Sequence, residues 1–436
     1  MNAAGFSWPC IVRLGSVQAS IGAMTMLATS LLNRLMVVEY GLAAGIPAGL
    51  VAWHYAVQLS RPVWGHGSDK GARRTPWILG GMAMLGLGAL LAVNAVVLLD
   101  TQRTVALITA ILAFSMIGAG VGAAGTSVLA MLASGVAPQR RAAAAATTWI
   151  MMVAGIVIAA GSAGALLDPY SEQRLAYVAG GIVGLAIIVS FTAMRGLEAK
   201  VSIPRTTHEE PVPNFPDAVR EILGEVEARR FTLFIFVSML AYSMQDLILE
   251  PFAGLLFAMT PGQSTSLSGL QHGGVLVGMI VSGVGGSAFA GRLPGELRTW
   301  IVLGCLGSAL ALCGLATAAV VGPGWPLAAN VVILGLFNGL FAVAAIGAMM
   351  GLAGAGQTTR EGVRMGVWGA AQAIAFGSGG LIGALGVDAA RHAMPSDGAA
   401  FQLVFGAEAG LFLVAALLAV RAARRPASLG TRWAQI

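Results

Sequence analysis

Charged residues are scarce in this chain of 436 residues: Asp, Glu, Lys and Arg make up only 10% of it, whereas 57% is apolar. Soluble proteins average about 25% charged residues, and so few could not cover the surface of a water-soluble fold. Cysteine is also rare, since the three present have neither paired nor metal-ligand spacing, which excludes a disulfide framework and a cysteine metal site. The composition therefore indicates an integral membrane protein, and its 60 glycines favour close packing of helices in lipid.

Motifs of catalysis are also missing. The sequence contains no nucleophile elbow, phosphate-binding loop, dinucleotide fingerprint or paired acid and base in a soluble pocket. The glycine-rich runs at 118–125 and 377–383 lie inside apolar segments, where close helix packing explains them. We therefore expect the protein not to be an enzyme.

The excess of basic residues gives a net charge of +6, and their distribution indicates membrane orientation rather than nucleic-acid binding. All but four of the Lys and Arg residues lie in one set of alternate connections between the apolar segments. The exceptions are Arg34, Arg103, Arg174 and Arg391. Because basic loops stay in the cytoplasm, both termini and the central loop are predicted to be cytoplasmic, which requires an even number of spans.

Apolar runs long enough to cross about 30 Å of hydrocarbon form two sets of six. They lie at 14–38, 43–63, 76–99, 104–133, 142–167 and 175–194, and then at 231–258, 266–290, 299–321, 327–353, 363–387 and 400–420. A charged stretch with four prolines separates the sets. The predicted organisation is an N-terminal six-helix half at 1–194, a cytoplasmic linker at 195–230, a C-terminal six-helix half at 231–420 and a cytoplasmic tail at 421–436.

An internal repeat supports this division. One constant shift superposes His54 on His272, Gly65 on Gly283 and Pro76 on Pro294. Inverted or parallel repeats of this kind are common in transporters. The expected fold is an all-α membrane protein with about twelve transmembrane helices in two pseudo-symmetric halves.

The loop after the second span contains Gly65, Asp69, Arg73 and Arg74, and it resembles the loop signature of the major facilitator superfamily. Glycines permit a tight turn, and Asp69 can pair with arginines or cap a neighbouring helix in one conformation. We predict a gating loop, with a plain positive-inside loop as the alternative.

Ionisable residues inside the spans are the main functional signal, because each costs at least about 2.5 kcal/mol at the bilayer centre unless it is paired or solvated. Asp246 and Glu250 lie four residues apart on one helical face, so both should not stay ionised without a nearby cation. Arg34 is the expected partner, with Glu39 close by. Two interpretations stay open: these residues staple two helices together, or one carboxyl titrates during proton-coupled transport.

The two histidines at equivalent repeat positions, His54 and His272, also have two interpretations. Each can be a hydrogen-bonded packing residue. Alternatively, a neutral imidazole can fill the open axial position of a metal held by a macrocycle. No carboxylate or cysteine cluster supplies a complete shell for a free metal ion, which argues against such a site.

Three segments resemble a known family. They are Tyr-Ser-Met-Gln-Asp-Leu-Ile-Leu-Glu-Pro-Phe-Ala-Gly-Leu-Leu-Phe at 242–257 with its continuation to residue 274, Leu-Asn-Arg-Leu-Met-Val-Val-Glu at 32–39, and Trp-His-Tyr-Ala-Val at 53–57. They are similar to the PucC and LhaA proteins, the bacteriochlorophyll delivery branch of the major facilitator superfamily. The resemblance covers nearly the whole chain and implies the major-facilitator fold.

The resemblance implies an assembly factor for photosynthetic light-harvesting complexes, located in the inner or intracytoplasmic membrane of a bacterium. Bacteriochlorophyll is the implied cofactor, with carotenoid open as a second pigment. The implied partners are antenna α and β polypeptides, the reaction-centre core or pigment-synthesis enzymes, and membrane lipid. The alternative function is proton-coupled secondary transport of a small or amphiphilic molecule.

The resemblance also suggests roles for the polar residues within the spans. It makes His54 and His272 candidate axial ligands of the bacteriochlorophyll magnesium. The remaining candidates would hydrogen-bond ring carbonyls or hold the halves closed. These are Arg34, Glu39, Gln245, Asp246 and Glu250.

Overall fold

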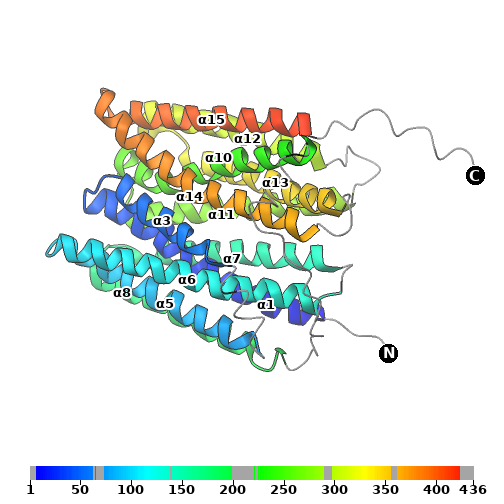
Figure 1. Cartoon of the computed structure of the whole chain (residues 1–436). Helices are drawn as coiled ribbons and strands as arrows, with labels where there is room; N and C mark the ends of the chain where they lie inside the picture. The colour runs from blue at the N-terminus through cyan, green and yellow to red at the C-terminus, as the bar shows by residue number, and fades with distance from the viewer. Residues whose placement is uncertain are drawn as a thin grey trace, which may run out of the picture.

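The computed structural model describes residues 6–61, 73–137, 140–198, 226–288, 297–354 and 361–422, together with Trp64, Arg220 and Gly224. These residues form a bundle of long helices that run roughly side by side (Figure 1). The start of α1 and the end of α15 lie at the same end of the bundle, which we call the terminal end. The other is called the opposite end.

The first group of helices lies in the lower part of Figure 1. Its first spanning helix covers Trp8–Glu39 and consists of α1 (Trp8–Met26), η1 (Leu27–Leu31), α2 (Leu32–Arg34) and η2 (Leu35–Glu39). The others are α3 (Gly45–Gln58), α5 (Thr75–Val97), α6 (Arg103–Gly135), α7 (Arg141–Leu167) and α8 (Glu172–Met194). Proline occupies the first turn of α1 and α5, where its missing N–H has no helical partner to lose.

The second group lies in the upper part of the same view. Its helices are α10 (Val226–Phe257), α11 (Pro261–Ala288), α12 (Leu297–Val321), α13 (Leu327–Gly354), α14 (Glu361–Ala393) and α15 (Asp397–Ala422). A short 3-10 turn, η5 (Gly322–Gly324), lies between α12 and α13.

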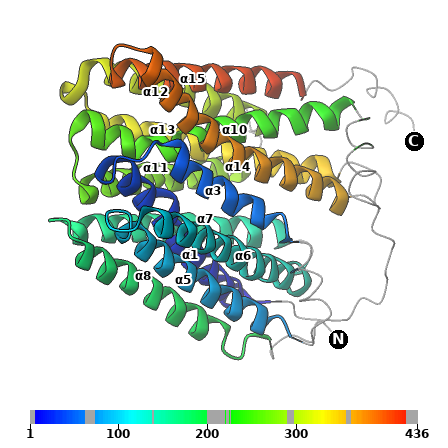
Figure 2. The same cartoon turned by 60° about the vertical axis from the view of Figure 1, so that its left-hand side comes forward.

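The two groups repeat one pattern of helix packing. In the first, α1 packs on α7 and α8, α5 on α6 and α8, and α3 on α6; in the second, α10 packs on α14 and α15, α12 on α13 and α15, and α11 on α13. The groups meet where α3 packs on α14 and where α7 packs on α11, in the middle of the bundle (Figure 2). This repetition confirms the prediction of two pseudo-symmetric halves.

Ten helices among the described residues are long and apolar enough to cross a membrane. The helices α3 and α11 complete the expected twelve. Only 14 residues are described in α3, and α11 carries many polar side chains along its first half. Helices satisfy every backbone group within one segment, which is why hydropathy predicts spanning segments so well.

Two predicted features fall mainly on residues outside the described ranges. Gly65 and Asp69 of the predicted gating loop lie there, and so does most of the predicted linker at 195–230. The structure does describe Arg73, which is exposed, and Arg74, which is half-buried. The gating loop therefore remains a prediction.

Glycines bring α11 and α13 into backbone contact. A Cβ added at Gly278 would lie 2.0 Å from the carbonyl oxygen of Leu336, and one added at Gly335 would lie 2.0 Å from that of Gln271. Gly274 and Gly339 repeat the arrangement four residues away on each helix. Small residues at this spacing let helices approach closely in lipid. The backbone of α11 is therefore held directly against α13.

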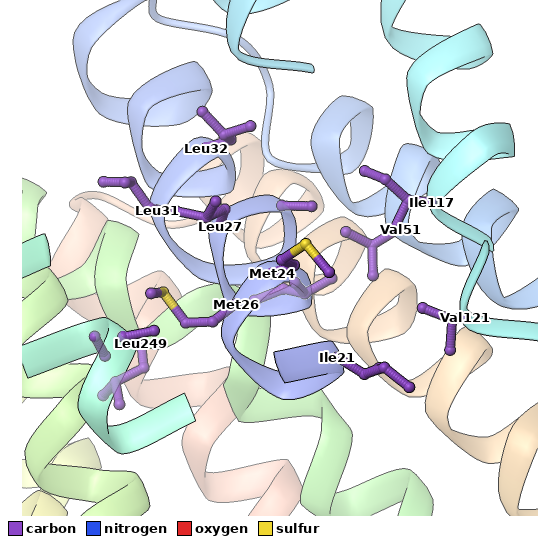
Figure 3. Packing of buried hydrophobic residues seen from close by; sticks show 14 of the residues in the cluster. Ile21, Met24, Met26, Leu27, Leu31, Leu32, Val51, Ile117, Val121 and Leu249 are labelled. Atoms are coloured by element: carbon purple, nitrogen blue, oxygen red, sulfur yellow. The ribbon is translucent and has the colours of Figure 1, made fainter. Parts of the chain in front are cut away.

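The core contains the middle of the first spanning helix. Leu27, Leu31 and Leu32 are fully buried there, and Figure 3 shows them with Val51 of α3 and Leu249 of α10. The apolar cluster thus joins helices of both halves around the polar residues described next.

Candidate functional site

The first spanning helix contains two π-helical stretches, η1 and η2, on either side of Asn33 and Arg34. Such wide turns are rare and occur often at functional sites. In this helix they lie where it packs on α10 of the other half. The contact therefore joins two of the segments that carry the family resemblance.

Pro251 explains one of these contacts. It lies inside α10 and has no N–H, so the carbonyl of Leu247, four residues earlier, lacks its usual helical donor. Asn33 fills the vacancy, because its Nδ2 donates to the Leu247 oxygen at 2.7 Å and its side chain is buried. A side chain of one half thus completes the backbone hydrogen bonding of the other.

Arg34 makes an ion pair with Glu39 of its own helix. Its Nη2 also donates to the carbonyl oxygen of Met259, just beyond α10, at 2.7 Å. A Cβ at Gly254 would lie 3.3 Å from Nη2 and 2.9 Å from Val38 Cγ2, so the glycine makes room for the contact. The prediction that Arg34 pairs with a carboxylate of α10 is wrong in its partner: Glu39 is nearer along the chain, and the π-helical turn η2 brings it back to Arg34.

Glu250 is bound by hydroxyl groups instead. Ser30 of the first helix donates to its Oε1, and Thr265 of α11 donates to its Oε2 at 3.3 Å. The Ser30 hydroxyl also lies 3.0 Å from that of Ser268. The Glu250 side chain is 1% exposed, so these contacts replace water around the carboxyl. Three helices from the two halves meet at this point.

His272 continues the same network. Its Nδ1 lies 2.9 Å from the carbonyl oxygen of Ser268. A carbonyl only accepts, so Nδ1 carries the proton and Nε2 keeps a free lone pair. Nε2 has no hydrogen-bond partner among the described residues, and the side chain is half-buried. We call Ser30, Glu250, Thr265, Ser268 and His272 the interface group.

His54 has a different environment, although it is the repeat equivalent of His272. Arg61 donates to Gln58 Oε1, which turns the Gln58 amide so that its Nε2 donates to His54 Nε2 at 2.8 Å. Nδ1 lies near the backbone of Val51 without good hydrogen-bond geometry. The lone pair that a metal would need is therefore already used by Gln58.

Asp246 and Gln245 are not hydrogen-bonded to the interface group. Asp246 Oδ1 is buried without a partner in the described part of the chain, and the residue lies within electrostatic reach of Tyr55 and Tyr242. Gln245 is 0% exposed, and both its amide oxygen and nitrogen are unpaired. Of the five predicted polar residues, the structure thus brings Glu250 to the interface group and pairs Arg34 with Glu39 beside it.

Sequence reasoning missed two carboxylates that act between the halves. Asp168, at the end of α7, accepts hydrogen bonds from the Gly262 amide at 3.2 Å and the Thr260 hydroxyl at 2.6 Å, at the start of α11. Asp388, in the last part of α14, accepts from the amides of Ala44 and Gly45, at the start of α3, at 3.0 and 2.7 Å. Both contacts lie at the opposite end and cap helix N-termini, which attract negative charge.

A third carboxyl was also missed. Glu408 of α15 is fully buried within a predicted apolar span. An ionisable residue in such a span is the signal that could have found it.

The interface group can bind a ligand in two ways. The hydroxyls and Glu250 offer hydrogen bonds, while the imidazole of His272 offers a nitrogen lone pair to a metal. Because the group joins the first helix, α10 and α11, a ligand bound there would contact both halves.

Two like-paired halves that enclose polar residues at mid-depth define a membrane protein of the major-facilitator fold, as the sequence predicts. The chain belongs to the PUCC protein family, whose model matches residues 31–427. This confirms the family indicated by the segments at 32–39 and 242–257.

Relatives of the chain extend over nearly its full length. It is 50% identical, over 97% of its length and 98% of the relative, to the bacteriochlorophyll synthase 44.5 kDa chain of Rhodobacter capsulatus. It is 30% identical to the protein PucC of Cereibacter sphaeroides, with 92% of this chain and 90% of that protein covered. A solved bacterial homolog of the human lysosomal transporter Spinster superposes with a TM-score of 0.68 at 14% identity, covering 94% and 96% of the two chains. The last likeness shows the fold alone.

Proposed function

We propose that the protein is an assembly factor for photosynthetic antenna complexes, which holds bacteriochlorophyll within the membrane and delivers it to antenna α and β polypeptides. Membership of the PUCC family supports this, as does the pigment named in the description of the relative that is 50% identical. That description also contains the word synthase. In our proposal the chain binds and delivers pigment, and no bond of the pigment changes.

The observation that carries the proposal is the state of His272. A histidine that ligates a metal usually donates its other ring N–H to a carbonyl or carboxylate, which fixes the tautomer and the ring orientation. His272 has this arrangement through Ser268, with Nε2 free. We propose His272 as the axial ligand of the pigment magnesium, while His54 would first have to give up Gln58.

The experiment is an absorption spectrum of the protein purified from pigment-making cells. We expect bacteriochlorophyll in the wild-type preparation and a severalfold loss in His272→Leu. His392→Leu is the matched control, because His392 also donates from Nδ1 to a carbonyl, that of Asp388 at 2.7 Å, but is exposed near the end of α14. Its pigment content should stay at the wild-type level, and His54→Leu should lose less than His272→Leu.

Two results would overturn parts of this proposal. Unchanged pigment in His272→Leu would remove the ligand assignment. A wild-type protein free of bacteriochlorophyll, both as purified and after incubation with the pigment, would remove pigment binding altogether. Antenna subunits that co-purify with such a pigment-free protein would indicate a docking partner instead.

We further propose that the terminal end faces the cytoplasm of a photosynthetic bacterium, and that residues 195–230 link halves at 1–194 and 231–420. The basic residues at the terminal end support this orientation. They include Arg13, which donates to the carbonyls of Ala193 and Arg195 at 2.9 and 2.6 Å, and Arg73 and Arg74. Reporter fusions at residue 436 should be active as cytoplasmic fusions only.

Proton-coupled transport is the second candidate function. It is favoured by the buried carboxyls Asp246 and Glu250 and by the fold shared with solved transporters. It predicts uptake into vesicles that depends on a pH gradient and is abolished by Asp246→Asn. Deletion of the gene separates the two functions, because an assembly factor predicts pale cells deficient in antenna but with normal growth under respiration.

A further inference from the structure

Glu408 lies inside the C-terminal half, away from any contact that would stabilise a charge. Its side chain is 0% exposed, and neither carboxyl oxygen has a hydrogen-bond partner in the ranges that the structure describes. The charge that acts on it is that of Asp246, another carboxyl. An ionised carboxylate in such a place costs several kcal/mol of desolvation without compensation.

Gln245 is the second unsatisfied group. It is also 0% exposed, and its amide oxygen and nitrogen both lack partners among the described residues. A buried amide left unpaired costs about 1–3 kcal/mol. Four polar atoms, two from each side chain, are therefore unpaired in the same half of the protein.

The packing of α10 on α15 places these two residues opposite each other. The helices are antiparallel, and the ring of Phe252 lies 5.3 Å from Phe401 and 5.1 Å from Phe405. Gln245 precedes Phe252 by seven residues, and Glu408 follows Phe401 by seven, so each lies about 10 Å further toward the terminal end on the same helical face. Glu408 also lies within reach of Asp246, the neighbour of Gln245.

A carboxylic acid and an amide satisfy one another completely. The acid O–H donates to the amide oxygen, and the amide N–H donates to the acid carbonyl oxygen. An ionised Glu408 could accept from the amide nitrogen but would leave the Gln245 oxygen without a donor. We propose that Glu408 and Gln245 form a buried proton-binding site in the C-terminal half, in which Glu408 is a neutral acid in this conformation.

This site is separate from the interface group and does not depend on pigment. The helices packed on α15 are α10, α12 and α14, and the titratable group on them whose charge acts on Glu408 is Asp246. A negative charge on Asp246 favours retention of the proton on Glu408, so the two carboxyls bind protons as a coupled pair. The C-terminal half thereby gains a group that responds to what happens at Asp246, beside the boundary with α3.

The experiment is infrared spectroscopy of the full chain in lipid at neutral pH. The wild-type spectrum minus that of Glu408→Gln should contain the carbonyl band of one protonated carboxyl. Glu198→Gln is the matched control, because Glu198 lies outside the spans and accepts three hydrogen bonds from Arg74 and Thr75. Its difference spectrum should contain the bands of an ionised carboxylate.

A carboxylate band in the Glu408→Gln difference would overturn the proposal, and so would a melting temperature that sodium raises in the wild type but not in Glu408→Gln, since both indicate a bound cation. Gln245→Met tests the site if Glu408→Gln does not fold. It should keep the protonated carboxyl band and move it to higher frequency, because a hydrogen bond to the acid is lost. An unmoved band would remove Gln245 from the site and overturn the pair.

Discussion

Asp168 and Asp388 hold equivalent places in the two halves, and each caps the first turn of a helix that belongs to the other half. Asp168 ends α7 and caps α11, while Asp388 lies in α14 and caps α3. These are the two helix pairs through which the halves meet. The four hydrogen bonds therefore fasten the halves together at the opposite end.

Removing the charge of either aspartate should loosen this end. A carboxylate at a helix N-terminus contributes about 0.3–1 kcal/mol, and up to about 2 kcal/mol when partly buried. We expect Asp168→Asn and Asp388→Asn each to speed the labelling of a Ser266→Cys reporter, on α11 beside Gly164 of α7, by a charged maleimide in detergent. The double variant should show the larger increase. Equal labelling in the double variant and the parent would contradict a fastening role.

Asn33 and Pro251 should be energetically coupled. Asn33→Leu leaves the Leu247 carbonyl buried and unpaired, at a cost of about 1–3 kcal/mol. Pro251→Ala restores the N–H four residues along the helix, so the double variant should melt at a higher temperature than Asn33→Leu alone. A coupling of about 0.5–3 kcal/mol is typical of residues that share a partner. Additive shifts in thermal unfolding would show that the carbonyl finds another donor.

Gly254 should tolerate no side chain. Its added Cβ would lie 2.9 Å from Val38, so Gly254→Ala should push the first helix from α10 at a cost of about 1–3 kcal/mol. Gly49→Ala is the control, because nothing lies within 4 Å of a Cβ there, and alanine is the better helix former by about 1 kcal/mol. Melting temperatures should fall for the first variant and stay level or rise for the second. The opposite order would refute the close approach.

Glu198 should make stability depend on pH at the terminal end. Burial opposes its ionisation, but hydrogen bonds from the Thr75 hydroxyl and the Arg74 and Thr75 amides outweigh it and hold the pKa of Glu198 below its usual value. A lowered folded-state pKa stabilises the protein at neutral pH. This contribution should begin to fall near pH 4.3, where a glutamate protonates in the unfolded chain, and be gone below the folded-state pKa.

The measurement for Glu198 is thermal unfolding of the wild type and Glu198→Gln between pH 7 and pH 3. The difference between their melting temperatures should shrink as the pH falls. Thr75→Val, which removes one of the three donors, should show an intermediate difference. A gap that stays constant with pH would show that the carboxyl does not titrate in this way.

Much of the fold follows from the sequence because the bilayer allows so few solutions. Apolar length alone predicted the helix at 327–353, and the structure has it at Leu327–Gly354. The repeat likewise placed His54 and His272 on equivalent helices. Hydropathy does not specify hydrogen bonds, however, so the different partners of the two imidazoles became visible only in the structure.

The candidate site was predictable in its residues but not in its connections. The cost of charge in lipid singles out Arg34 and Glu250, yet their partners depend on the π-helical turns of the first helix, which no residue pattern announces. The role of Asn33 depends on Pro251, more than two hundred residues away. Asp168 and Asp388 lie at helix ends, where a carboxylate costs little and gives no signal in the sequence.

The glycine contacts between α11 and α13 limit how His272 can be reached. Two backbones in direct contact leave no side chain to rearrange, so α11 is unable to rotate about its axis without dragging α13 along. The imidazole consequently does not swing outward into the lipid to collect a ligand. A bulky guest has to slide inward to a stationary nitrogen, and its width is set by how far α7 parts from α11.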